Sequence, residues 1–204
     1  MNGVSGQYAL DNDACNGFVQ NSGKWNIKGN VMSLIDYNNM TTMTEMIGNF
    51  YYLFSDYDGF KHGNTIEIVN ANDFALPATT LASYCYSNMF YSCTSLTKAP
   101  TLPATTLADS CYANMFSGCT NLTTAPELPA TTLEPGCYSF MFESCTSLIT
   151  ATCLAMDISA TDCVAGWLYG IQTTGTLYVD PSMIDKWKDT EYGCPDTWTV
   201  QAIQ

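Results

Sequence analysis

The sequence LPATTLASYCYSNMFYSCTSLTKAPT at residues 76–101 is followed directly by LPATTLADSCYANMFSGCTNLTTAPE at residues 102–127. Eighteen of the 26 positions are identical between these two copies. A third copy, over residues 128–153, keeps LPATTL, CY, MF and CT. Such a period predicts a repeat architecture, because one unit alone cannot bury its apolar face and has to stack on its neighbours.

Each unit is expected to contain a short helix and an extended segment. Within residues 82–92 and just beyond, Cys85, Met89 and Cys93 recur at every fourth position, which places them on one face of a helix. The prolines at positions 100 and 103 exclude a helix from the residues that follow. We therefore expect an α/β repeat solenoid whose sheet hydrogen bonding is interrupted by proline.

The repeats predict three parts of the chain. Residues 1–41 are a polar segment followed by a β cap, in which WNIKGNVMSLI at residues 25–35 forms a hairpin or a bent strand. Residues 42–175 form the solenoid of about four to five units, the first of them a worn copy in which Leu53-Phe54 occupies the place of Met89-Phe90. Residues 176–204 form the C-terminal cap, since a solenoid needs atypical end units.

The C-terminal part has clear local signals. GTLYV at residues 175–179 predicts a strand, and WTV at residues 198–200 predicts a last strand. Asp180 followed by Pro181 predicts a helix N-terminus, and this helix is expected to run to about Asp189.

The composition excludes some classes of function. The chain has six lysines and no arginine against 19 acidic residues, with a net charge of −13. Nucleic-acid binding is not expected, because neutralising phosphates requires a basic stripe. The sequence contains no run of 18 or more apolar residues, which a membrane-spanning helix would need, so no membrane insertion is expected. The first twenty residues do not have the pattern of a signal peptide.

The repeat unit resembles a known family. In the second copy, Leu102-Pro103, Leu107, Met115-Phe116, Cys119 and Leu122 match the leucine-rich repeats of the BspA-like surface proteins of oral and gut anaerobic bacteria. The resemblance covers about residues 25–204 and implies a leucine-rich-repeat solenoid. It also implies a role in adhesion or host interaction, without naming a ligand, and similar repeats in phage tail proteins leave a virion origin open.

The ten cysteines allow three interpretations. The spacing CYxxMFxxC does not match common zinc sites, so no metal and no cofactor are expected. Disulfides between stacked units are geometrically possible. The favoured interpretation is two ladders of buried thiols, with any structural disulfide falling to Cys15, Cys153 or Cys194. A cysteine nucleophile needs a base, and His62, the single histidine, lies in a loop insertion, so no enzyme is expected.

The extended segments provide the candidate binding residues. Their outward positions form a strip that varies between copies while the core positions stay fixed, which is typical of a recognition surface, although drift on an exposed face explains the variation equally well. Two further candidates come from the insertion before the first full copy. The candidate residues are Thr97, Lys98, Thr101, Thr123, Thr124, Glu127, Thr150, Tyr57 and His62.

We expect a non-catalytic, extracellular recognition or adhesion module of a bacterial cell-surface protein. Its partner is expected to be a host or bacterial surface protein or glycan. The alternatives are a phage tail or receptor-binding component with the same fold, which would place the protein in a virion, and a glycan-capture accessory protein.

Overall fold

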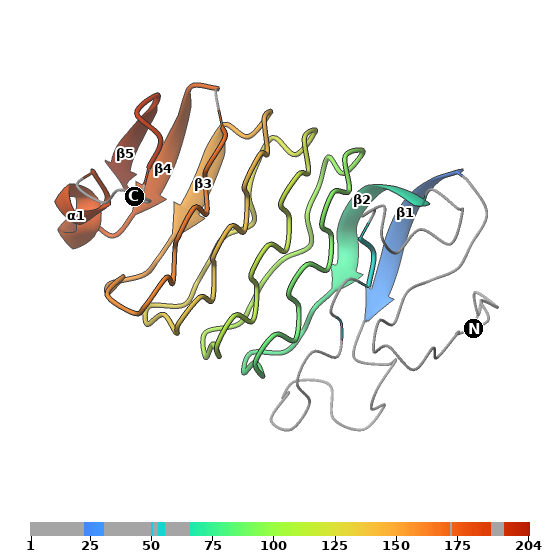
Figure 1. Cartoon of the computed structure of the whole chain (residues 1–204), viewed down its shortest axis with the longest axis horizontal. Helices are drawn as coiled ribbons and strands as arrows, with labels where there is room; N and C mark the ends of the chain where they lie inside the picture. Colours follow the sequence, from blue (N-terminus) through green and yellow to red (C-terminus); the bar gives the residue numbers. More distant parts are fainter. Residues whose placement is uncertain (1–22, 31–49, 51–52, 56–65, 172, 189–193) are drawn as a thin grey trace.

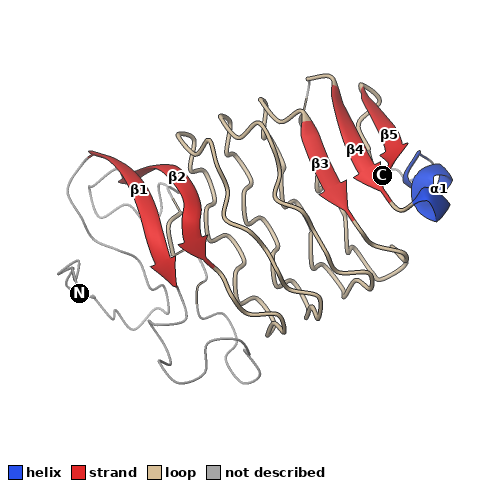
Figure 2. Ribbon diagram, turned by 180° about the vertical axis from the view of Figure 1, so that it is seen from behind, coloured by secondary structure: helices blue, strands red, loops and turns tan. Residues whose placement is uncertain are grey.

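The structure is a computed structural model that describes residues 23–30, 50, 53–55, 66–171, 173–188 and 194–204. Figure 1 shows extended segments lying side by side along the long axis, from β1 and β2 at one end to β3, β4 and β5 at the other. Between β2 and β3 the chain runs back and forth as loops and turns (Figure 2). The helix α1 (Ile184–Lys188) lies at the β5 end.

The named strands form two small parallel sheets. β1 (Gly23–Asn30) pairs with β2 (Ile66–Ala75). At the other end β3 (Thr150–Cys153), β4 (Gly175–Val179) and β5 (Trp198–Ala202) pair in that order. The strands β3 and β4 pair with the repeat period, since each β3 residue lies opposite the residue 26 positions later.

Adjacent repeats are joined through aromatic rings that stack 26 residues apart. Phe90 lies on Phe116 with ring centroids 5.5 Å apart, and Phe116 lies on Phe142 at 5.6 Å. Phe54 stacks on Phe90 at 5.3 Å, which confirms that Leu53-Phe54 occupies the place of Met89-Phe90. Trp167 ends the row edge-on to Phe142 at 6.2 Å and contacts the buried Trp187 of α1 at 5.1 Å.

The helix predicted over residues 82–92 is wrong. This stretch is a series of tight turns in which every fourth residue, Tyr84, Asn88 and Ser92, has a positive φ between 57° and 58°. A right-handed helix cannot contain such residues. The cause is the neighbouring repeat: alternate backbone N–H groups donate to its carbonyls, as Tyr86 does to Cys111 at 2.9 Å, and the others close turns within the unit.

The turns still bury the side chains that the fourfold spacing singles out. Cys85 and Met89 are fully buried, and so are Tyr86 and Phe90 beside them. The nine described cysteines are free thiols, all but Cys194 buried, which confirms the interpretation as buried thiols over this part of the chain. Cys15 lies outside the described residues.

The C-terminal elements agree with their sequence signals. After β4, the Asp180 side chain accepts a hydrogen bond from the Ser182 backbone N–H, and a 3-10 turn (Pro181–Met183) leads into α1 (Ile184–Lys188). At the other end, β1 has an irregular register between Trp25 and Lys28, so residues 25–30 of the predicted segment form an irregular strand. Residues 31–35 lie outside the described residues.

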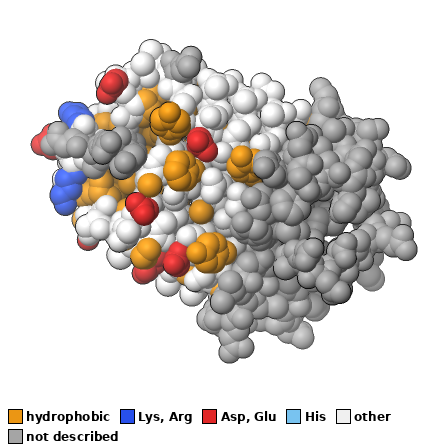
Figure 3. All heavy atoms as spheres, viewed as in Figure 1, with side chains coloured by type: hydrophobic (Ala, Val, Ile, Leu, Met, Phe, Trp, Pro, Cys, Tyr) orange, Lys and Arg blue, Asp and Glu red, His pale blue; other side chains and the backbone are white. Residues whose placement is uncertain are grey.

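The described surface carries few charges. On the face shown in Figure 3, uncharged polar side chains and backbone occupy much of the described surface, and basic side chains gather at the end where Figure 1 places α1. Across the described residues, no helix has both the length and the apolar content needed to cross a membrane.

Candidate functional site

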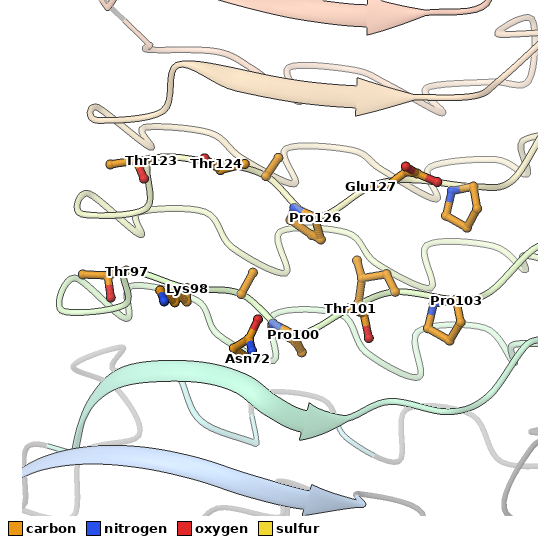
Figure 4. A pocket seen from close by; sticks show the side chains of 14 residues that line it. Asn72, Thr97, Lys98, Pro100, Thr101, Pro103, Thr123, Thr124, Pro126 and Glu127 are labelled. Atoms are coloured by element: carbon orange, nitrogen blue, oxygen red, sulfur yellow. The ribbon is translucent and has the colours of Figure 1, made fainter. Parts of the chain in front are cut away.

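An open groove of about 610 Å³ lies on the extended segments of the first two full repeats. One wall comes from residues 97–103 and the other from residues 123–129, and Asn72 of β2 closes one side. Figure 4 shows the two segments running alongside each other, with Pro100 and Pro126 near the middle. The lining residues are Asn72, Thr97, Lys98, Ala99, Pro100, Thr101, Leu102, Pro103, Thr123, Thr124, Ala125, Pro126, Glu127 and Pro129.

The groove lies at a gap in the sheet hydrogen bonding. The first segment is bonded to β2, where the Ala71 N–H donates to the Lys98 carbonyl at 2.9 Å. The second is bonded to β3, where the Ala125 N–H donates to the Thr150 carbonyl at 2.9 Å. Among the described residues, no backbone hydrogen bond joins residues 97–103 to residues 123–129.

Proline limits the hydrogen bonding of both segments. Pro100 and Pro126 occupy the same place in successive copies, and proline has no backbone N–H to donate to a ladder. The third copy has Thr152 at this place, and it is the copy that forms a regular strand, β3. The predicted interruption of the sheet by proline is thereby confirmed for these segments.

The groove has one charge of each sign. Lys98 and Glu127 are both exposed, and neither forms an ion pair with another described residue. In Figure 4, Lys98 lies toward one end of the groove and Glu127 toward the other, with the two prolines between them. The Thr97 hydroxyl donates to the Val69 carbonyl at 2.9 Å, which holds this wall against β2. The arrangement offers hydroxyls and two opposite charges around an apolar floor.

Six of the nine candidate residues line this groove: Thr97, Lys98, Thr101, Thr123, Thr124 and Glu127. Thr150 is in β3, where it forms a parallel bridge with Thr124, and it does not line the groove. Tyr57 and His62 lie outside the described residues. The sequence strip therefore overlaps the groove and extends beyond it.

The sequence interpretation missed Asn72 and the proline floor. Asn72 is exposed in β2, upstream of the regular copies, so the 26-residue period does not relate it to the strip. From the sequence, Pro100, Pro103, Pro126 and Pro129 are expected only to interrupt strands. Their recurrence at two places in each unit is the signal that indicates a shared apolar lining.

The thiols in the described part of the chain lack the features of a nucleophile or a metal centre. Burial raises the pKa of Cys85 and of Cys145 to about 12, so both are protonated at neutral pH. Cys119 donates its thiol proton to the Phe90 carbonyl at 3.2 Å. Among the described residues, no group of three or more histidine, cysteine or acidic side chains is arranged to hold a metal ion.

Comparisons of the chain with protein-family models, with curated proteins and with solved structures found no match.

Proposed function

We propose that this protein is a non-catalytic recognition module, a short leucine-rich-repeat solenoid of the BspA-like type, that acts in adhesion at a bacterial cell surface. The observation that carries the proposal is the groove, where six residues selected from the sequence as variable and outward-facing line one concavity. A groove whose lining contains a single lysine, a single carboxylate and no cysteine supports binding in preference to catalysis.

The test is binding of the purified chain to an array of glycans and extracellular matrix proteins, beside the double variant Lys98→Ala/Glu127→Ala. Both side chains are exposed, so the variant is expected to fold as the parent does. We expect specific binding by the parent and at least a severalfold weaker signal from the variant. A second variant, Thr124→Trp, places a bulky side chain in the groove and is expected to block binding sterically.

Two outcomes would redirect the proposal. Binding that both variants retain would place recognition outside the groove, with the insertion that contains Tyr57 and His62 as the next segment to test. No binding to any host or bacterial surface component would favour the alternative, a phage tail component with the same fold.

A further inference from the structure

The strand β5 has an open edge. It is the outermost strand of the three-stranded sheet, and Figures 1 and 2 show it at the end of the row of extended segments. Just beyond β5, the Ile203 backbone N–H donates to the Val179 carbonyl of β4 at 2.9 Å. Because backbone groups alternate in direction along a strand, those of Val200 and Ala202 point away from β4. None of the described residues forms a backbone hydrogen bond with these outward groups.

This edge lacks the features that normally prevent pairing with another chain. Edge strands are usually protected by a charged side chain, a proline or a bulge. Residues 197–204 contain no charged residue and no proline, and β5 pairs with β4 without a register shift. By contrast, β1 at the opposite end carries the exposed Lys28 and has register shifts on both sides of Asn26. Of these two end strands, β5 is the one suited to accept another strand.

We propose that two copies of this protein join through β5, with their β5 strands antiparallel about a two-fold axis at Gln201. This inference is independent of the ligand that the groove binds. In this register Val200 of each copy lies opposite Ala202 of the other, and each such pair exchanges two backbone hydrogen bonds. The outward backbone groups of both residues are then satisfied in both copies.

The chemistry of the edge favours a second copy as the occupant. The exposed Gln201 would lie opposite its own counterpart, and a side-chain amide both donates and accepts, so two glutamines complement each other. The chain has a net charge of −13, but the charge-free residues 197–204 bring no like charges face to face. Apolar side chains at this end are also only half-buried against the core, namely Ile184, Cys194 and Val200.

The symmetry of this pairing determines the size and the shape of the assembly. A two-fold interface uses the β5 edge of both copies, so the assembly closes at two chains. The axis is perpendicular to the sheet, so both copies present the same face on the same side. Thr199 lies on the groove face, since Thr124, Thr150, Thr176 and Thr199 follow one another across the paired segments. Both grooves would therefore face the same way, which allows bivalent attachment to a surface.

Cysteine cross-linking tests the register. Gln201→Cys is made in a Cys15→Ser/Cys194→Ser background, which removes the half-buried thiol and the one outside the described residues. Residues opposite each other at a non-hydrogen-bonded antiparallel position have Cα atoms about 4.5 Å apart, a distance that permits a disulfide. We expect mild oxidation to give a covalent dimer that a reductant reverses. Thr199→Cys in the same background is the control, because the two copies of this residue would lie about 13 Å apart along the strands.

Sedimentation velocity over a wide concentration range tests the association itself. We expect the parent to form a reversible dimer of twice the mass of one chain. Val200→Pro removes one outward donor from each hydrogen-bonded pair and should weaken the dimer about tenfold or more, with circular dichroism to check its fold.

A charge exchange at the two-fold axis leaves the backbone unchanged. Gln201→Lys and Gln201→Glu should each weaken the dimer, because like charges then lie opposite each other, and an equimolar mixture of the two should restore it. Thr131→Lys adds the same charge at an exposed position far from β5 in the sequence and should leave the dimer unchanged.

The remaining outcomes each overturn the proposal. A monomer at all concentrations, without a Gln201→Cys cross-link, would exclude this dimer. A dimer that neither Val200→Pro nor Gln201→Lys weakens would place the interface elsewhere, and equal cross-linking of Thr199→Cys would exclude the register. A monomer that binds an extended peptide along β5 would show that the edge takes a foreign strand. None of these results bears on the groove, since glycan and matrix binding is measured separately.

Discussion

Three tyrosine hydroxyls, those of Tyr86, Tyr112 and Tyr138, are buried without a hydrogen-bond partner. Their rings stack at 5.7 and 6.1 Å between successive repeats, so ring packing and not hydrogen bonding holds these side chains in place. A buried polar group without a partner lowers stability by about 1–3 kcal/mol relative to a satisfied one.

We therefore expect Tyr112→Phe to be neutral or to stabilise the fold by up to about 1 kcal/mol, because the change removes an unsatisfied hydroxyl and keeps the ring. Chemical denaturation monitored by circular dichroism measures the free energy of unfolding. Tyr169→Phe is the control, since Tyr169 is 69% exposed and its hydroxyl is in contact with water. Destabilisation by more than 1 kcal/mol would show that the Tyr112 hydroxyl has a partner.

The buried thiols predict sensitivity to alkaline pH. Burial raises the pKa of Cys85, Cys145 and Cys153 to about 12 from an ordinary value of 9.0. Above pH 9 the unfolded chain releases these protons while the folded chain keeps them, so the stability present below pH 9 falls as pH rises toward 12. Denaturation midpoints measured from pH 7 to pH 11 should decline above pH 9, and a flat profile would contradict the burial of protonated thiols.

At the scale of elements, the turns of each repeat depend on residues that accept a positive φ. The sequence carries a signal for this conformation that the helix interpretation passed over. Glycine and asparagine recur at the fourfold-spaced positions, as in Asn88, Asn114, Gly118, Gly166 and Gly170. These residue types adopt the left-handed conformation most readily.

At Gly166, two effects of a side chain can be separated: backbone strain from the positive φ and overlap of the added Cβ atom with a neighbouring side chain. Its φ is +58°, and a Cβ atom built there would lie 2.5 Å from the Phe140 ring. Gly166→Ala should therefore destabilise the fold by about 2 kcal/mol or more through strain and overlap. In Gly166→Ala/Phe140→Ala the overlap is absent, so the double variant should be less destabilised than the sum of the two single variants. Additive effects in thermal or chemical denaturation would mean that Phe140 does not contact this position.

Whether an extended segment forms a regular strand depends on whether it contains a proline in its middle. Segments with a proline in the middle make isolated bridges, such as the bridge between Asn70 and Lys98, while the copy with Thr152 makes a strand. The sequence therefore predicts where the ladder is interrupted. The sequence does not predict the groove between two successive copies. The groove depends on which neighbouring segment accepts or donates each backbone hydrogen bond, and only the tertiary structure shows these partners.

At the scale of the whole molecule, the period of 26 residues decides which side chains meet. Deletion of one complete unit, residues 102–127, should keep the rows in phase, because Phe90 would then face Phe142 and Tyr86 would face Tyr138. We expect this variant to fold cooperatively with a lower melting temperature and without groove binding, since Glu127 and its wall are removed. Deletion of residues 102–114, half a unit, should abolish the cooperative transition in circular dichroism.

An out-of-phase deletion that folds as well as the in-phase one would show that stacking between units is not the main source of stability. The comparison is clean because both deletions begin at the same residue and remove the same LPATTL sequence. It also separates folding from recognition, because the in-phase variant keeps its core but lacks one wall of the groove.

The sequence by itself determined the repeat period, the identity of the buried positions and the start of the C-terminal helix. These follow from local chemistry: repeated apolar positions have to be buried, and Asp180-Pro181 caps a helix wherever it lies. The tertiary structure alone decided that residues 82–92 are turns and that a groove opens beside Pro100 and Pro126. Both depend on hydrogen bonds between residues about 26 positions apart, and a spacing of four fits a helix and a series of turns equally well until the neighbouring repeat provides the acceptors.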